Sequence, residues 1–195
     1  MTVSAHDDIP TMAREAYRIG EEVGFHLSSD VSTGRLLRIL AASKPSGRAL
    51  EVGTGLGAGA AWILDGLDRG SRLTTLEAHP EAAERSRQIL SADPRATVVE
   101  TDAAAWLESY DDPPFDLAFV DTTVVKFERL DLLVRHLAPG GLLVADDLLP
   151  QPKWNDTHAE RVARFRAEIV DHPALVPLLV DWGSGLLLAC LAPSR

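Results

Sequence analysis

Short apolar runs alternate with longer amphipathic segments along most of the chain. Residues 11–42 carry apolar side chains at three- and four-residue spacings, which predicts an N-terminal helical segment, and Lys44-Pro45-Ser46-Gly47 interrupts that pattern. The later amphipathic segments predict helices near 58–68, 80–91, 103–109, 126–137 and 157–171. The apolar runs between them predict strands at 49–53, 73–77, 97–100, 115–121 and 142–146.

Near-continuous apolar strands that alternate with helices are typical of a parallel sheet covered on both faces. Two further strands are expected at 178–180 and 186–191. The short turn between them fits an antiparallel hairpin, because a parallel crossover needs about a dozen residues or more. The pattern therefore predicts one α/β domain over residues 11–195, with N-terminal helices in 11–42 and a poorly ordered segment at 1–10.

Composition and charge narrow the classes of partner. The chain has 195 residues, of which 46% are hydrophobic, enough for one domain with a sizeable core. Its 29 Asp and Glu residues outnumber 19 Lys and Arg residues, which argues against a nucleic-acid partner, since phosphate binding favours a basic face. Residues 1–10 lack the apolar core of a signal peptide, and the longest apolar run, 186–192, is too short to span a bilayer. We therefore expect a cytoplasmic protein with no membrane partner.

A glycine-rich run follows the first strong strand and opens a helix. Gly53, Gly55, Gly57 and Gly59 stand at alternate positions. Glycines let the backbone approach a ligand closely, and the free amides of a helix N-terminus attract an anion. The run also fits the looser dinucleotide fingerprint, with Glu77 ending the next strand. An NAD(P)-dependent oxidoreductase is therefore one candidate function.

Acidic residues within and at the ends of the strands distinguish this chain from a typical dinucleotide-binding protein. Glu51 lies inside the strand before the glycines, where an ionised group is costly unless it meets a polar partner, such as the ammonium group of a cofactor. Successive strands end in glycine or in an acidic residue, and in an open α/β sheet that edge is where ligands bind. These strand-end residues are Gly53, Glu77, Asp102, Asp121 and Asp146.

The stretch from Ser28 to Cys190 resembles the catechol/caffeoyl-CoA O-methyltransferase-like group of class I S-adenosylmethionine (SAM)-dependent methyltransferases. This resemblance implies a Rossmann-like seven-stranded sheet of order 3-2-1-4-5-7-6 with the seventh strand antiparallel. It also implies transfer of a methyl group from SAM to an oxygen of a small-molecule acceptor. The segments that carry it are ALEVGTGLG at 49–57, TTLEAHP at 74–80, FDLAFVD at 115–121 and PGGLLVADD at 139–147.

The resemblance also implies roles for single residues. Glu51 and the glycine run would contact the methionine part of SAM, Glu77 the ribose hydroxyls, and Asp102 the adenine, while Asp121 would lie beside the reacting methyl group. The expected cofactor residues are Glu51, Gly53, Thr54, Gly55, Gly57, Gly59, Glu77, Ala78, Asp102, Ala103 and Asp121.

The family binds a divalent cation through the fourth-strand aspartate and an Asp-Asn pair after strand five. That cation gathers the acceptor hydroxyls and lowers their pKa. The corresponding residues here are Asp121, Asp146 and Asp147, and three carboxylates are suitable ligands for Mg²⁺ or Ca²⁺. In the alternative interpretation, Asp147 only caps the following loop.

The family's general base is less well matched. A lysine is usual three residues after the strand-four aspartate, and this chain has Val124 there. Lys126 is a candidate substitute, although a solvated position in the first turn of its helix is the more common role. His158, the third catalytic candidate with Asp121 and Lys126, is suited to proton transfer near neutral pH. Trp154 is either an acceptor platform or the anchor of a lid.

Two further hypotheses remain open from the sequence. A protein that has lost the catalytic base could bind SAM and act by interaction rather than by catalysis. The helical segment at 11–42 could pack across a homodimer.

Overall fold

The computed structural model describes residues 8–150 and 156–192, and its centre is a seven-stranded sheet. The strand order is β3-β2-β1-β4-β5-β7-β6. Strands β1 to β5 pair in parallel, and β7 runs antiparallel to both of its neighbours. The predicted order and the antiparallel seventh strand are therefore confirmed. The strands are β1 (Arg48–Val52), β2 (Arg72–Glu77), β3 (Ala96–Glu100), β4 (Phe115–Val120), β5 (Leu137–Ala145), β6 (Leu175–Val180) and β7 (Leu186–Leu191).

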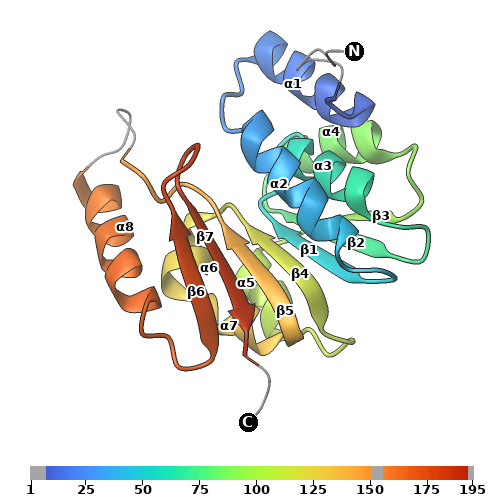
Figure 1. Ribbon diagram of the computed structural model, residues 1–195. Helices are drawn as coiled ribbons and strands as arrows, with labels where there is room; N and C mark the ends of the chain where they lie inside the picture. Colours follow the sequence, from blue (N-terminus) through green and yellow to red (C-terminus); the bar gives the residue numbers. More distant parts are fainter. Residues whose placement is uncertain (1–7, 151–155, 193–195) are drawn as a thin grey trace, which may run out of the picture.

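Helices cover both faces of the sheet (Figure 1). Neighbouring residues of β1 point to opposite faces: Ala49 packs in a core with Trp62 of α3, and Leu50 packs in a second core with Phe165 of α8. Among the described residues, no helix is long and apolar enough to cross a membrane. One layer holds α1 (Thr11–Val23), α2 (Val31–Ala42), α3 (Ala58–Gly66) and α4 (Pro80–Leu90), and the other holds α5 (Ala103–Glu108), α6 (Thr123–Glu128), α7 (Leu130–Arg135) and α8 (Asp156–Ile169).

The prediction of a single helix at 126–137 is wrong. The structure has two short helices, α6 and α7, which meet at the non-helical Arg129, and Leu137 already belongs to β5. Leu137 pairs with Phe115, and Leu142 pairs with Leu117. The register shifts between these two pairs, and this shift accommodates the Pro-Gly-Gly sequence at 139–141 of β5. Strand pairing with β4 overrides the helical spacing of apolar residues, since tertiary context outweighs local preference.

The helical segment predicted at 11–42 is divided in two. Gly24 ends α1 in a left-handed conformation with φ of 71°, and its amide donates to the carbonyl of Gly20. Asp30 then caps α2, where its carboxylate accepts a hydrogen bond from the amide of Thr33 at 2.8 Å. The intervening residues 24–30 connect the two helices near the carboxyl edge of the sheet.

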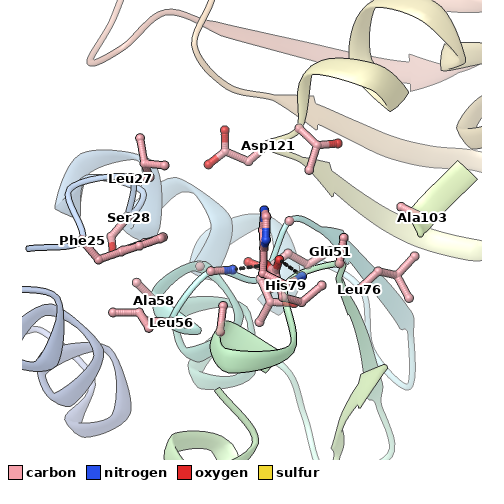
Figure 2. Close-up of a pocket in the computed structure, with 18 of the residues that line it drawn as sticks. Phe25, Leu27, Ser28, Glu51, Leu56, Ala58, Leu76, His79, Ala103 and Asp121 are labelled. Atoms are coloured by element: carbon pink, nitrogen blue, oxygen red, sulfur yellow. Dashed lines mark hydrogen bonds between the residues drawn. The ribbon is translucent and has the colours of Figure 1, made fainter. Parts of the chain in front are cut away.

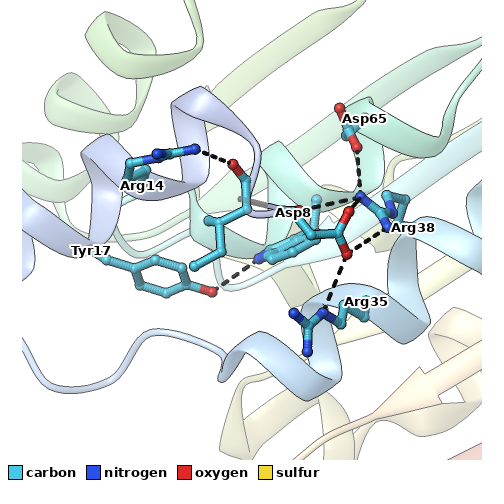
Figure 3. A network of polar contacts seen from close by, with 8 residues as sticks. Asp8, Arg14, Tyr17, Arg35, Arg38 and Asp65 are labelled. Carbon is cyan, nitrogen blue, oxygen red and sulfur yellow. Dashed lines mark hydrogen bonds and ion pairs between the residues drawn. The ribbon is translucent and has the colours of Figure 1, made fainter. Parts of the chain in front are cut away.

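Asp8, the first of the described residues, belongs to a polar network with α2 (Figure 3). The Asp8 carboxylate pairs with Arg38 at 2.9 Å and with Arg35 at 3.4 Å, and Arg38 also reaches Asp65 of α3 at 3.3 Å. The poorly ordered segment expected at 1–10 stays a prediction, although Asp8 within it makes these contacts. Residues 1–7 of that prediction lie outside the described residues.

Candidate functional site

A pocket of about 1050 Å³ opens at the carboxyl edge of the sheet (Figure 2). The loop between α1 and α2 and the turns that follow β1, β2, β3 and β4 line it. Four of the five predicted strand-end residues, Gly53, Glu77, Asp102 and Asp121, lie in its wall. Asp146, the fifth, does not line the pocket. Four of the residues that the sequence places at strand ends therefore converge on one cavity.

The glycines of the turn after β1 are required by close approaches of other groups. Gly53 has φ of 96°, and a Cβ there would lie 2.7 Å from a methyl group of Thr122 and 3.0 Å from the carbonyl oxygen of Asp121. At Gly59, a Cβ would lie 2.3 Å from a carboxylate oxygen of Glu51. The first turn of α3 can therefore approach the Glu51 side chain only because residue 59 is glycine.

Glu51 is a buried carboxylate at the base of the pocket, with 1% of its surface exposed. It accepts a hydrogen bond from the hydroxyl of Thr75, which in turn is bonded to the hydroxyl of Thr54. Burial raises the pKa of Glu51 to about 8, and the negative charges of Asp121 and Glu77 add to this rise. Three carboxylates face one cavity, so the site favours a positively charged ligand.

Glu77 connects the end of β2 to the glycine turn. Its two carboxylate oxygens accept hydrogen bonds from the backbone amides of Gly55, at 2.8 Å, and His79, at 2.9 Å. Only 7% of Glu77 is exposed, and it lines the pocket together with Ala78. The carboxylate is thereby held in one orientation at the pocket wall, where the sequence predicted contact with a ribose.

Asp102 and Ala103 form the side of the pocket beyond Glu77. The Asp102 carboxylate caps α5 by accepting a hydrogen bond from the amide of Ala105 at 2.8 Å. Both residues line the pocket, and the amide of Thr101 donates to the carbonyl of Glu77, which holds the ends of β2 and β3 together. The predicted adenine residues are thus placed beside the predicted ribose residue.

The opposite wall of the pocket is a loop, residues 24–29, that was not predicted from the sequence. The Phe25 ring packs against the glycine turn, so that a Cβ at Gly55 would lie 3.0 Å from it. Two hydrogen bonds fix this loop: the Trp62 indole donates to the Tyr17 hydroxyl at 3.0 Å, and that hydroxyl donates to the carbonyl of Ser29 at 2.9 Å. Gly24 and Asp30 are helix-end signals in the sequence that could have revealed the loop.

An apolar rim surrounds the entrance on this side of the pocket. Val23, Leu27 and Val124 line the pocket with 49%, 78% and 50% of their surfaces exposed. Figure 2 shows Asp121 pointing into the same part of the pocket, and burial together with the charge of Asp146 raises the pKa of Asp121. One acidic group thus stands within a rim of aliphatic side chains.

Lys126 is buried rather than solvated, so the expectation of a solvated side chain is wrong. Only 2% of it is exposed, and its ammonium donates a hydrogen bond to the carbonyl of Asp146 at 2.6 Å. It does not line the pocket, whereas Val124 does. Residues two apart on a helix point about 200° apart, so Val124 and Lys126 face opposite sides of α6.

Two of the three predicted metal ligands, Asp146 and Asp147, do not line the pocket. The Asp146 carboxylate accepts hydrogen bonds from the amide of Asp147, at 2.7 Å, and from the hydroxyl of Ser184 in the turn between β6 and β7. Asp147 has a left-handed backbone with φ of 58°, and neither residue lines the pocket with Asp121. Within residues 8–150 and 156–192, no group of three or more His, Cys, Asp or Glu side chains could hold a metal ion. A metal ion held by Asp121, Asp146 and Asp147 stays a prediction.

The remaining catalytic candidate, His158, packs edge-on against the ring of Phe127 with 5.6 Å between the ring centroids. Burial and the charge of Lys126 lower the pKa of His158. It does not line the pocket. Trp154 lies outside the described residues. Of the three catalytic candidates, the structure therefore brings only Asp121 to the pocket.

Comparison with known proteins agrees with this geometry. Residues 50–148 match the methyltransferase domain family. A "Putative O-methyltransferase" of Mycolicibacterium vanbaalenii is 30% identical over 168 residues, which cover 81% of this chain and 74% of that protein. A putative O-methyltransferase from Klebsiella pneumoniae superposes with a TM-score of 0.80 at 25% identity, over 93% of this chain and 90% of the other. The O-methyltransferase from Bacillus cereus in complex with S-adenosylhomocysteine (SAH) has a TM-score of 0.81 at 22% identity, with the same coverage.

These matches favour the methyltransferase interpretation over an NAD(P)-dependent oxidoreductase. They extend over the glycine turn, the acidic strand ends and the sheet order that the sequence singled out. The chain belongs to the methyltransferase domain family, within the class I fold.

Proposed function

We propose that this protein transfers the methyl group of SAM to an oxygen of a small, apolar acceptor. The observation that carries the proposal is the buried Glu51 carboxylate, which faces a glycine-lined pocket together with Glu77 and Asp121. SAM carries two positive charges, on its ammonium and its sulfonium. A pocket walled by three carboxylates has the charge that complements such a ligand.

The residues present fit the parts of this cofactor. Glu51 of β1 lies beside the first turn of α3 and would pair with the ammonium group. Glu77 would accept hydrogen bonds from the ribose hydroxyls. Asp102 and Ala103 would lie beside the adenine. The volume of about 1050 Å³ is at the upper end of the usual range for ligand pockets, so cofactor and acceptor have room together.

SAM, when bound, supplies a methyl group on positively charged sulfur, which needs only an aligned nucleophile. The chain contributes alignment, exclusion of water and a proton acceptor. Phe25 and Leu27 would shield the methyl end of the pocket from solvent. Asp121 is the candidate proton acceptor, because it alone of Asp121, Lys126 and His158 lines the pocket.

The rim points to an acceptor without charge. Val23, Leu27 and Val124 offer aliphatic surface at the entrance, and Val124 stands where the family usually has a lysine. Such a rim gains free energy by covering an apolar or aromatic ring. Oxygen as the accepting atom rests on the names of the relatives.

The cofactor is tested by thermal melting. SAH should raise the melting temperature by mass action, and NAD and NADP should leave it unchanged. The variant Glu77→Ala should bind SAH about 10–150-fold more weakly, the scale of hydrogen bonds to a charged group. Glu100→Ala is the matched control, because Glu100 is the register partner of Glu77 on β3 and does not line the pocket. Stabilisation by NAD alone would contradict the proposal.

A further inference from the structure

Glu51 has one apolar and one polar neighbour in its row of the sheet. Its register partner on β4 is Phe119, and its register partner on β2 is Thr75. Thr75 is in turn paired with Val98 of β3. Side chains at paired positions of parallel strands point to the same face of a sheet, so Thr75 is the neighbour in this row that can bond to the Glu51 carboxylate. A buried carboxylate is costly without such a partner.

The hydroxyl of Thr75 joins Glu51 to the turn after β1. Thr75 is fully buried and does not line the pocket, whereas Thr54 does. The Thr75 hydroxyl donates to the Glu51 carboxylate, and it is also bonded to the hydroxyl of Thr54. A hydroxyl has a single proton to donate. Because the proton of Thr75 goes to Glu51, Thr54 must donate to Thr75, and the chain of bonds has one direction.

This chain helps to fix the plane of the Glu51 carboxylate. The bond from Thr75 falls on Oε2, while Oε1 lies against the first turn of α3, where a Cβ at Gly59 would be 2.3 Å from it. The backbone of Ala60 also bonds to this carboxylate. A group that is already held in its binding orientation loses less freedom when a ligand arrives. A hydrogen bond donated to a carboxylate also favours its ionised form, which a cationic ligand requires.

We infer that Thr75 is a positioning residue for the cofactor, whose hydroxyl, oriented by Thr54, turns the Glu51 carboxylate toward the amino-acid end of SAM. The inference rests on the proposed function, in which Glu51 pairs with the ammonium of SAM. Thr75 acts through Glu51, since it does not itself line the pocket. It should therefore contribute to binding of the amino-acid end and not to binding of the adenosine end, which Glu77 would hold.

The test compares two ligands by isothermal titration calorimetry. Methylthioadenosine keeps the adenine, ribose and sulfur of SAH and lacks its amino-acid end. Thr75→Val keeps the shape of the side chain and removes the hydroxyl. SAH should bind to this variant about 10-fold more weakly, the scale of one hydrogen bond to a charged group, and methylthioadenosine should bind as it does to the wild type. Thr75→Ser keeps a hydroxyl and should restore most of the SAH affinity.

The matched control is Thr74→Val, on the same strand. Thr74 is half-buried, pairs with Leu50 on the other face of the sheet, and does not line the pocket. Both affinities should stay at their wild-type values in this variant. Thr75→Ala, a second variant without the hydroxyl, should show the same selective loss as Thr75→Val, so the test does not depend on the folding of one variant.

A double variant tests whether Thr75 acts through Glu51. In a Glu51→Gln background, Thr75→Val should cost little further SAH affinity, because the charge that Thr75 orients is already gone. An undiminished further loss overturns the inference. An equal loss of both ligands in Thr75→Val also overturns it, as does unchanged SAH affinity. A wild type that binds neither ligand would instead overturn the proposed cofactor, and this inference with it.

Discussion

At the scale of single residues, the most informative group is Glu51. Its carboxyl is buried under the first turn of α3, and its pKa is raised from an ordinary 4.5 to about 8. Between pH 4.5 and about pH 8, the folded protein therefore keeps a proton on Glu51 that the unfolded chain has released. The protonated Glu51 contributes its full stabilisation of the folded state below about pH 4.5, and this contribution is lost as the pH rises through about 8.

The variant Glu51→Gln tests this linkage, because it keeps the shape and removes the titration. Without ligand, the stability of the variant relative to wild type should grow between pH 5 and 8, by at most roughly 1.4 kcal/mol per pH unit. Denaturant unfolding at several pH values measures it, with the exposed Glu21→Gln as control. A constant difference at every pH would show that Glu51 keeps an ordinary pKa.

The same variant should lose cofactor affinity. The ammonium of SAH would pair with an ionised Glu51, so wild-type affinity should rise as the pH increases from 6 to 8, and the variant should bind weakly without that rise. Isothermal titration calorimetry measures both, and wild-type binding near pH 7 should release a proton into the buffer. Equal affinity of variant and wild type would place the ammonium elsewhere.

At the scale of elements, the loop between α1 and α2 depends on α3. The Tyr17 hydroxyl stands between the Trp62 indole and the Ser29 carbonyl, and these two bonds hold residues 24–29 over the glycine turn. The loop contributes Phe25 and Leu27 to the pocket. The Tyr17 hydroxyl therefore joins this wall of the site to α3.

Tyr17→Phe keeps the ring and removes both bonds. We expect stability to fall by about 1–3 kcal/mol, because the indole donor loses its partner, and SAH affinity to fall several-fold as the loop loosens. Tyr110→Phe is a close control on the other face of the sheet, where the Tyr110 hydroxyl likewise joins Arg48 to the carbonyl of Pro113. It should lose stability and keep SAH affinity. Equal SAH affinities in the two variants would show that the conformation of this loop does not affect cofactor binding.

At the scale of the whole molecule, the pocket joins parts that belong to different layers. The loop 24–29 extends from the α1–α4 layer, while residues 101–104 and 121–125 lead into α5 and α6 of the other layer. A ligand that touches all of them stabilises the folded state as a unit. The homodimer and the cytoplasmic location stay predictions at this scale.

Hydrogen exchange measures this coupling. On addition of SAH, amides in 24–29, 53–59, 101–104 and 121–125 should exchange more slowly, because local opening of any of these segments would break contacts to the ligand. The β6–β7 hairpin lies outside the pocket wall and should be unchanged. Protection confined to the glycine turn would show that the cofactor does not span the two layers.

Much of the fold and of the cofactor site was set by local sequence. Alternating apolar runs fixed the strands, and the residue at each strand end fixed the chemistry of the edge, since parallel strands bring their carboxyl ends together. Glu51, Gly53 and Glu77 could be identified for this reason. Their places in the pocket wall follow from their positions on the strands, which the periodic pattern predicts.

Other features were decided only by tertiary structure. Leu137 joined β5 through its pairing with Phe115, and the Asp146 carboxylate bonds to the hydroxyl of Ser184, which lies 38 residues later in the chain. The burial of Lys126 likewise involves a distant group, because its ammonium donates to the carbonyl of Asp146. Local spacing determines which face of an element a residue occupies, but the partner on that face comes from distant sequence. The free energy of burying a charge therefore depends on neighbours that no local pattern contains.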